Sequence, residues 1–307
     1  MELFYQYWLS PESARNGKNA AGNRTVVFHH GVGEHSGRYQ NLLDAFEGDD
    51  IDFFALDCRG HGHSPGTRGD APGVGAFVQD LEDFIQFIRA EHGVVMPILL
   101  GHSMGGLIAI AFALTHSNQW HLRGLVTSGA ALTPHLDFIQ NLKINSAQLL
   151  VHLAPRLVMP TGLPPTGLSH DQRVIDQYRN DSLCHDKLSV RLGVSLVETG
   201  TDCLRRSDLL KIPVLITHGN DDPIVNPQGS IDFYHRVLSA DRDLIVYPGL
   251  YHEIYNETLD QRERVFKDLR NWVLTHTPER VTETEADMAT VSSDPQASAN
   301  IAVSTPD

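Results

Sequence analysis

ILLGHSMGGLIAIAFAL (residues 98–114) places a serine between two glycines, directly after an apolar run and directly before a run of small residues. The first run has the composition of a buried strand and the second that of a helix. Gly101, Ser103 and Gly105 therefore fit the GxSxG pattern in the strand–turn–helix context that it requires. Such a turn holds the hydroxyl above a sheet, beside the free amides of the helix N-terminus. This arrangement suits nucleophilic attack.

Short, β-rich apolar runs closed by turn residues recur on both sides of this stretch. Helical patterns separate them, with apolar residues at 77, 81, 84, 85 and 88 in one segment and at 265, 269, 272 and 273 in another. Alternating strands and helices predict an α/β fold, a mostly parallel sheet flanked by helices, with ligands at the carboxyl ends of the strands. The predicted strand runs are residues 24–31, 51–57, 96–103, 122–129, 212–219 and 243–249.

One interval, residues 130–206, contains no convincing strand but holds amphipathic segments and a proline-rich piece. A stretch of that length between two strands predicts a helical cap, or lid, over one end of the sheet and over the active site. Residues 1–129 and 207–277 then form the core. Residues 278–307 are acidic and lack Leu, Phe, Tyr and Trp. We therefore expect a disordered tail there.

Composition narrows the function classes. The formal net charge of −14 disfavours nucleic acid and anionic membranes as partners. The three cysteines have no paired spacing, which argues against a disulfide framework and a zinc site, so we expect no metal. The N-terminus lacks the basic residues and cleavage site of a signal peptide, and no apolar stretch is long enough to span a bilayer. We expect a cytoplasmic protein, with peripheral contact at membranes left open.

A nucleophilic serine needs a base, and that base needs an orienting carboxylate. Asp221 and Asp222 follow the strand run at 212–219, and His252 follows the next run. The chain order Ser, Asp, His differs from the orders of the chymotrypsin and subtilisin triads.

With these residues the chain resembles the α/β-hydrolases, and within them the monoacylglycerol lipase and lysophospholipase group. The resemblance covers roughly residues 24 to 275 and departs at Ser182, where the cap motif of the group usually has proline. Four motifs carry it: HHGVGEHSGRY (29–39) is similar to the HGxGEHSxRY loop, DCRGHGHSPG (57–66) to the DxxGHGxSxG turn, GHSMGG (101–106) to the elbow, and SHDQRVIDQYRNDSL (169–183) to the middle of the cap.

The resemblance implies an α/β-hydrolase fold with Ser103 as nucleophile, His252 as general base and then acid, and Asp222 as the residue that orients His252. The GxxD motif of the group, counted from Gly219, ends at Asp222, and Asp221 is the alternative acid.

The resemblance also implies an oxyanion hole made by the backbone N–H groups of Val32 and Met104. Four further residues match positions near the polar head of the substrate in that group. From the residues alone, the four could equally form a structural polar network, in which Glu34 and Arg38 make an ordinary i,i+4 ion pair. They are Glu34, Arg38, His102 and Tyr178.

Leucines and isoleucines of the cap interval form an apolar stripe that includes Ile139 and Leu142. Either this stripe packs on the core, or it lines an acyl pocket over the serine and makes transient contact with lipid surfaces. The stripe is Leu136, Ile139, Leu142, Leu149, Leu150 and Leu153.

We therefore predict a carboxylic ester hydrolase that needs no cofactor and cleaves monoacylglycerols to fatty acid and glycerol through an acyl-enzyme on Ser103. A lysophospholipase or a broad-specificity carboxylesterase would use the same chemistry on other esters. A non-catalytic binding protein on the same fold is the alternative from another class. Such proteins usually lose the serine, the histidine or an oxyanion glycine, and this chain keeps all of them.

Overall fold

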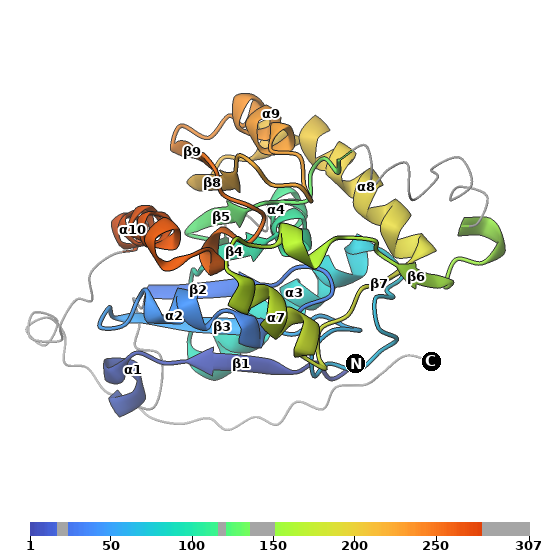
Figure 1. The fold of residues 1–307 in the computed structure, drawn as a ribbon. Coiled ribbons are helices and arrows are strands. Elements are labelled where there is room, and N and C mark those ends of the chain that lie inside the picture. The colour runs from blue at the N-terminus through green and yellow to red at the C-terminus, as the bar shows by residue number, and fades with distance from the viewer. Residues whose placement is uncertain (17–23, 116–120, 136–150, 278–307) are drawn as a thin grey trace, which may run out of the picture.

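A seven-stranded sheet forms the centre of the protein in a computed structural model, which describes residues 1–16, 24–115, 121–135 and 151–277 (Figure 1). The strand order is β1-β3-β2-β4-β5-β8-β9, with all neighbours parallel except the antiparallel pair β1 and β3. The strands are β1 (Tyr5–Trp8), β2 (Arg24–His29), β3 (Ile51–Leu56), β4 (Ile98–His102), β5 (Gly124–Ser128), β8 (Val214–Gly219) and β9 (Arg242–Tyr247).

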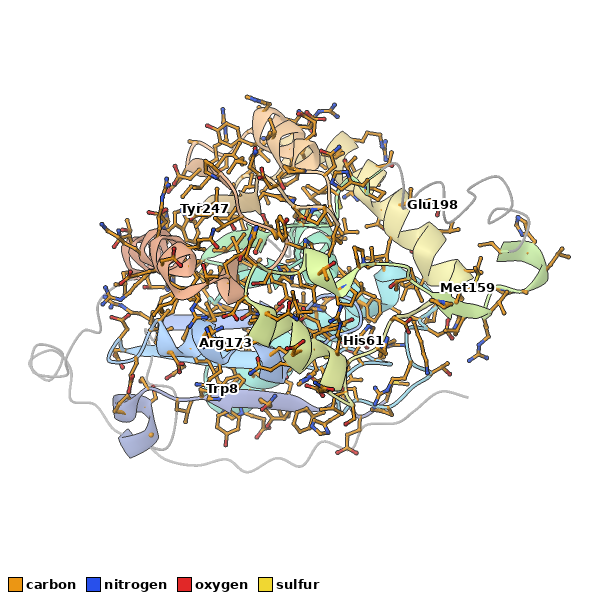
Figure 2. All side chains as sticks on the ribbon, viewed as in Figure 1. Trp8, His61, Met159, Arg173, Glu198 and Tyr247 are labelled. Atoms are coloured by element: carbon orange, nitrogen blue, oxygen red, sulfur yellow. The ribbon has the colours of Figure 1, made fainter. Side chains whose placement is uncertain are left out.

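Helices cover both faces of the sheet, and the side chains between the layers form two apolar clusters (Figures 1 and 2). One cluster joins the sheet to α3, α4, α8 and α9, and the other joins it to α2 and α10. The helices are α1 (Pro11–Asn16), α2 (Gln40–Asp44), α3 (Val74–His92), α4 (Met104–Leu114), α7 (Gln172–Asn180), α8 (Val190–Arg205), α9 (Gln228–Arg236) and α10 (Leu259–His276), with 3-10 turns η1 (Ser36–Arg38), η3 (Pro165–Gly167), η4 (Ser207–Leu209) and η5 (Ile254–Asn256).

The predicted, mostly parallel sheet flanked by helices is confirmed, and each of the six predicted strand runs overlaps a strand. The sequence patterns did not predict β1, because a four-residue strand at a sheet edge is too short to show a recognisable alternation. Of the described helices, none combines the length and the apolar character that crossing a membrane would need.

The interval between β5 and β8 carries η3, α7 and α8, and also a small antiparallel sheet of β6 (Val158–Pro160) and β7 (Lys187–Ser189). The prediction of no strand between residues 130 and 206 is therefore wrong, because three-residue strands leave no periodic signal. Helix α8 packs on α3 and α4, with Leu192 and Cys203 in their apolar cluster. The boundaries of the cap stay a prediction.

Part of the predicted cap stripe, and the whole predicted tail, lie outside the described residues. This applies to Ile139 and Leu142 and to residues 278–307. Nearby, three large apolar side chains around β6 are exposed to solvent, on a segment that projects beyond the sheet (Figure 2). They are Leu153, Leu157 and Met159.

Candidate active site

The turn between β4 and α4 carries Ser103 in a strained backbone conformation. Its φ of 55° and ψ of −119° make it the sole non-glycine residue with positive φ in the described part of the chain. The glycines on either side permit this turn, since a Cβ on Gly101 would overlap the carbonyl oxygen of Gly105, and a Cβ on Gly105 that of His29. Close approach of backbone to backbone therefore fixes the Ser103 side chain at the sheet edge.

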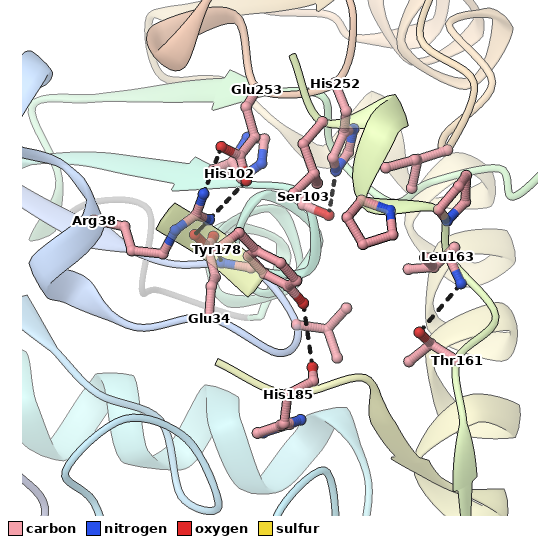
Figure 3. Close-up of a pocket in the computed structure, with 16 residues that line it drawn as sticks. Glu34, Arg38, His102, Ser103, Thr161, Leu163, Tyr178, His185, His252 and Glu253 are labelled. Carbon is pink, nitrogen blue, oxygen red and sulfur yellow. Dashed lines mark hydrogen bonds and ion pairs between the residues drawn. The ribbon is translucent and has the colours of Figure 1, made fainter. Parts of the chain in front are cut away.

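The structure brings Ser103, His252 and Asp222 together at the carboxyl ends of β4, β8 and β9. The Ser103 Oγ lies 2.9 Å from His252 Nε2 (Figure 3), and His252 Nδ1 lies 2.7 Å from Asp222 Oδ2. The alternative acid, Asp221, is exposed, and its carboxylate accepts a hydrogen bond from the Asn220 amide. Asp222 is therefore the carboxylate that contacts the imidazole.

The contacts of Asp222 keep its carboxylate ionised. Burial raises its pKa, but the charge on His252 and hydrogen bonds from His218 and His252 more than offset this, so the pKa lies far below 3.8. Its other oxygen, Oδ1, accepts from the backbone amides of Ile224 and Val225 at 2.8 and 3.0 Å. Burial lowers the pKa of His252, and Asp222 raises it to a net value above 6.5. The imidazole is therefore a readily protonated base.

The two predicted oxyanion donors border the space next to Ser103. Met104 begins α4, so its backbone N–H is one of the amides without a partner inside the helix. Val32 follows Gly31, whose amide donates to Glu34 Oε1 at 2.6 Å. Both residues line a pocket that also includes Ser103.

A cluster of buried charges lies on one side of Ser103 (Figure 3). The Arg38 guanidinium donates to Glu34 Oε2 at 2.7 Å and to both carboxylate oxygens of Glu253 at 2.7 and 2.9 Å. These three side chains are almost inaccessible to solvent. Arg38 thus joins the loop that follows β2 to the loop that carries His252.

His102 and Tyr178 complete this polar side of the site. The His102 ring centroid lies 4.7 Å from that of His252, and burial lowers the pKa of His102 to about 4, so its ring is uncharged near neutral pH. Tyr178, on α7, has its ring 5.0 Å from the Arg38 guanidinium and donates its hydroxyl to the His185 carbonyl. All four residues predicted near a substrate head line the same pocket as Ser103.

Sequence reasoning missed two residues of the site, Glu253 and His218. Glu253 lies directly after His252, but its partner Arg38 is 215 positions away, so no local spacing connects them. His218 ends the apolar run of β8 and contacts Asp222. A histidine at the end of an apolar run, four residues before the acid, was the available signal.

The opposite side of Ser103 is apolar. A second pocket opens from the serine between the sheet edge and the segment that connects β5 to β8. Thr161 and Leu163, labelled in Figure 3, line both pockets. The lining of the second pocket consists of Val32, Ser103, Met104, Ala131, Pro134, Thr161, Leu163, Leu188, Leu196, Val197, Ile224 and Val225.

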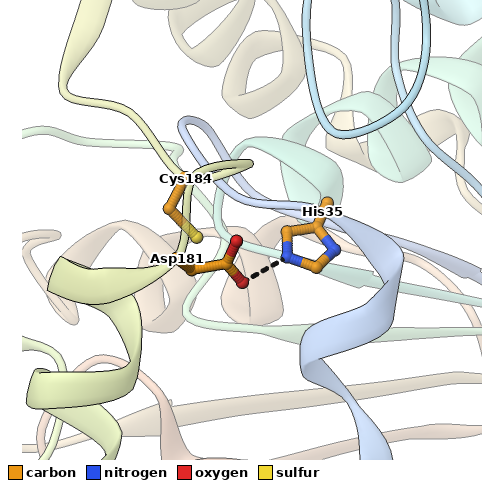
Figure 4. Close-up of side chains that lie close together, drawn as sticks. All are labelled: His35, Asp181 and Cys184. Atoms are coloured by element: carbon orange, nitrogen blue, oxygen red, sulfur yellow. Dashed lines mark hydrogen bonds and ion pairs between the residues drawn. The ribbon is translucent and has the colours of Figure 1, made fainter.

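Three potential metal ligands, His35, Asp181 and Cys184, lie within 4.8 Å of one another (Figure 4). His35 Nδ1 accepts from the Gly37 amide, so Nε2 carries the proton and donates to Asp181 Oδ2 at 2.9 Å. Burial raises the pKa of Cys184 to about 12, which keeps its thiol protonated. In this structure the contact between His35 and Asp181 is a hydrogen bond between their side chains.

Comparisons with known proteins agree with this geometry. A family model described as serine aminopeptidase, S33, matches residues 21–259. The monoacylglycerol lipase of Mycolicibacterium smegmatis is 32% identical over 277 residues, which cover 90% of this chain and 94% of that protein. The crystal structure of Paleococcus ferrophilus monoacylglycerol lipase has a TM-score of 0.77 at 30% identity, over 90% of this chain and 100% of that one. A soluble variant of the Saccharomyces cerevisiae monoglyceride lipase, in complex with a substrate analogue, has a TM-score of 0.79 at 27% identity, over 90% of this chain and 92% of that one.

The chain belongs to the serine aminopeptidase S33 family of α/β-hydrolases, and within it to the monoacylglycerol lipase group.

Proposed function

We propose that this protein is a serine ester hydrolase that cleaves monoacylglycerols to fatty acid and glycerol through an acyl-enzyme on Ser103. One observation carries the proposal: a pocket with one wall of buried charged and polar side chains, called the polar pocket below, and an apolar pocket meet at the Ser103 hydroxyl, which lies within hydrogen-bonding distance of His252. A single-chain lipid ester has the same division, with a polar alcohol on one side of the carbonyl and an acyl chain on the other. The relatives named monoacylglycerol lipase support this substrate class.

Each residue of the triad has one task in the proposed reaction. His252 takes the proton of Ser103 as the oxygen attacks the ester carbonyl, and Asp222 stabilises the imidazolium that forms. The backbone amides of Val32 and Met104 donate to the oxyanion. His252 then protonates the departing glycerol oxygen, and a water molecule repeats the sequence on the acyl-enzyme.

The contacts in the polar pocket disfavour aminopeptidase chemistry, which the family description raises. An aminopeptidase must bind a free ammonium group, and this requires a carboxylate oxygen that is free to accept from it. All four oxygens of the two carboxylates that line the pocket, Glu34 and Glu253, already accept hydrogen bonds from Arg38 or from a backbone amide of the protein. A neutral glycerol head, bound near His102 and Tyr178, fits this wall better than a cation does.

Residues 130–206 act as the cap of this site in our proposal. This interval supplies Thr161, Leu163 and Tyr178 to the polar pocket. The exposed apolar side chains around β6, Leu157 and Met159 among them, would give the cap transient contact with lipid surfaces. Flotation with neutral-lipid liposomes should recover wild-type protein and less of a Leu157→Asp variant. The predicted cytoplasmic location stays a prediction.

The decisive experiment is monoacylglycerol hydrolysis by the wild type and by Ser103→Ala. The variant should lose activity by a factor on the order of 10³ to 10⁶ while its circular dichroism spectrum stays unchanged. A fluorophosphonate probe should label Ser103 of the wild type. Retained turnover in Ser103→Ala would refute the assignment, and absent labelling of folded protein would favour a binding protein.

A substrate panel separates the esterase alternatives. The value of kcat/KM should be higher for monoacylglycerols with long acyl chains than for lysophosphatidylcholine or p-nitrophenyl acetate. The apolar pocket can take an acyl chain that acetate lacks, and the two carboxylates beside Arg38 disfavour a negatively charged phosphate. A higher value for lysophosphatidylcholine would identify a lysophospholipase. A preference for the acetate would identify a short-chain carboxylesterase.

A further inference from the structure

His218 is a buried histidine that the proposed reaction does not use. It lies near the end of β8 with its side chain inaccessible to solvent. Its Nε2 lies 3.0 Å from Asp222 Oδ2 and 3.3 Å from the carbonyl oxygen of Val225, and both of these atoms only accept hydrogen bonds. Its Nδ1 lies 2.7 Å from the Ser230 hydroxyl, which can donate. These contacts select the tautomer that carries the proton on Nε2.

Asp222 Oδ2 therefore accepts from two imidazoles, His252 at 2.7 Å and His218 at 3.0 Å. We propose that His218 is a positioning residue of the triad, which fixes the orientation of the Asp222 carboxylate and competes with His252 for its Oδ2 atom. This inference rests on the proposed function, because it assigns a task to a neighbour of the proposed triad.

Two consequences follow from a shared oxygen. Without the His218 donor, His252 is the single partner of Oδ2, so the orientation of the carboxylate, and with it that of the His252 ring toward the Ser103 Oγ, is fixed less precisely. The carboxylate also becomes a stronger partner for His252, because one hydrogen bond no longer withdraws its electron density. Loss of this bond should therefore lower kcat and move the acid limb of the pH profile to higher pH.

Other charged and titratable groups near His252 do not change in this comparison. They are Glu34, His102 and Glu253. His218 lines neither pocket at Ser103, so KM should stay constant when His218 is replaced.

Two variants of similar polarity test the inference. In His218→Gln the amide nitrogen can take the place of Nε2 and donate to Asp222. In His218→Asn the shorter side chain ends near the place of Nδ1 and cannot reach the carboxylate. We expect His218→Asn to lower kcat about 10- to 100-fold with KM unchanged and a higher acid midpoint, and His218→Gln to restore most of the activity.

Equal kcat values and equal acid midpoints in the two variants would overturn the inference, since a purely structural histidine would not distinguish them. Ser103→Ala, assayed beside them, separates this failure from a failure of the proposed function. If Ser103→Ala is inactive and the two His218 variants behave alike, the triad stands and the role of His218 does not.

A measurement on the wild type covers the case in which His218→Asn fails to fold. Nitrogen-15 NMR of histidine-labelled protein, with His218→Gln used to identify the resonances, reports which ring nitrogen of His218 carries the proton. We expect protonation at Nε2. Protonation at Nδ1 alone would overturn the inference, because Nε2 could then not donate to Asp222.

Discussion

The turn at Ser103 and the loop at His252 supply two parts of the proposed reaction, yet different interactions stabilise them. The Ser103 turn depends on backbone packing, because its flanking glycines leave no space for a Cβ atom. The His252 loop depends on buried carboxylates, with Glu253 paired to Arg38 and Glu257 bound to the cap segment. Steric packing does not depend on charge. Substitutions that remove a charge should therefore destabilise the His252 loop and leave the Ser103 turn unchanged.

Glu257 joins the His252 loop to the segment between β6 and α7, which belongs to the proposed cap. Its carboxylate is buried and accepts from the Tyr251 amide at 2.8 Å, the His170 amide at 2.9 Å and the His170 ring at 2.9 Å. His170 belongs to the segment between β6 and α7, and Tyr251 precedes His252. A single carboxylate thus joins that segment to the loop that carries His252.

Removal of Arg38 should cause the largest loss of unfolding free energy, because Arg38 is the cation that pairs with both Glu34 and Glu253 beside the His252 loop. Arg38→Met leaves two buried carboxylates, Glu34 and Glu253, without their cation. Uncompensated buried charge typically costs about 3–5 kcal/mol of unfolding free energy. Urea unfolding followed by circular dichroism measures this loss.

Arg270→Met is the matched control. Arg270 also forms an ion pair, with Asp49, but its side chain is 45% exposed. Solvent screens such a pair, so the loss should stay below about 1 kcal/mol. Similar losses for the two arginines would show that burial of the Arg38 cluster contributes nothing.

Gly105→Ala should cause the next largest loss of unfolding free energy, and it tests the steric packing of the Ser103 turn. The new Cβ would overlap the backbone carbonyl oxygens of His29 and His30, which belong to β2 and the turn after it and cannot rotate away. Overpacking of this kind should cost about 3 kcal/mol of unfolding free energy and lower kcat about 100-fold, because the Ser103 Oγ is displaced.

Gly75→Ala gives the comparison for that substitution. Gly75 lies in α3 with nothing within 4 Å of the added Cβ and without a positive φ. Alanine there should stabilise the helix by about 0.5–1 kcal/mol. If both alanine variants unfold at the same urea concentration, the steric account of the Ser103 turn is wrong.

The same contrast explains what the sequence could predict. The Ser103 turn is encoded within a few contiguous residues, so its geometry was predictable from the GxSxG pattern and the runs beside it. Asp222 could be found by counting from Gly219. The Arg38 and Glu253 pair could not, because it joins segments that meet only in the folded chain. His218 lies four residues before Asp222, but the sequence pattern does not show that its side chain points toward the carboxylate. Neither did the short strands β6 and β7 leave a pattern.

Glu257→Gln tests the hydrogen bonds by which Glu257 joins the proposed cap to the His252 loop. The substitution keeps the size of the side chain but turns an acceptor oxygen into a donor amide, which then faces the N–H groups of Tyr251 or His170. One unmade buried hydrogen bond of this kind costs about 2 kcal/mol. Glu263→Gln, on the exposed face of α10, should change the unfolding free energy by less than about 0.5 kcal/mol. An equally small change for Glu257→Gln would contradict the link.

The pH profile of the wild type should show how the buried carboxylates change the pKa of His252. His252 must be neutral to take the Ser103 proton, so protonation inactivates the enzyme and kcat/KM falls as the pH decreases through the His252 pKa. Burial lowers this pKa, whereas Asp222, Glu253 and Glu34 raise it to a net value above 6.5. We therefore expect the midpoint of the acid limb above pH 6.5. A midpoint below that value would mean that burial outweighs the carboxylates.

Glu253→Gln should produce the smallest of these effects, a downward shift of that midpoint by less than about one pH unit. The substitution removes one of the negative charges that raise the pKa of His252 and leaves Arg38 with Glu34 as its single ionic partner. Both changes disfavour the imidazolium, so the acid limb should move to lower pH. An unmoved or higher midpoint would mean that Glu253 only holds the His252 loop in place and does not change the pKa of His252. The Ser103 turn and the His252 loop would then differ in their contacts but not in their sensitivity to charge.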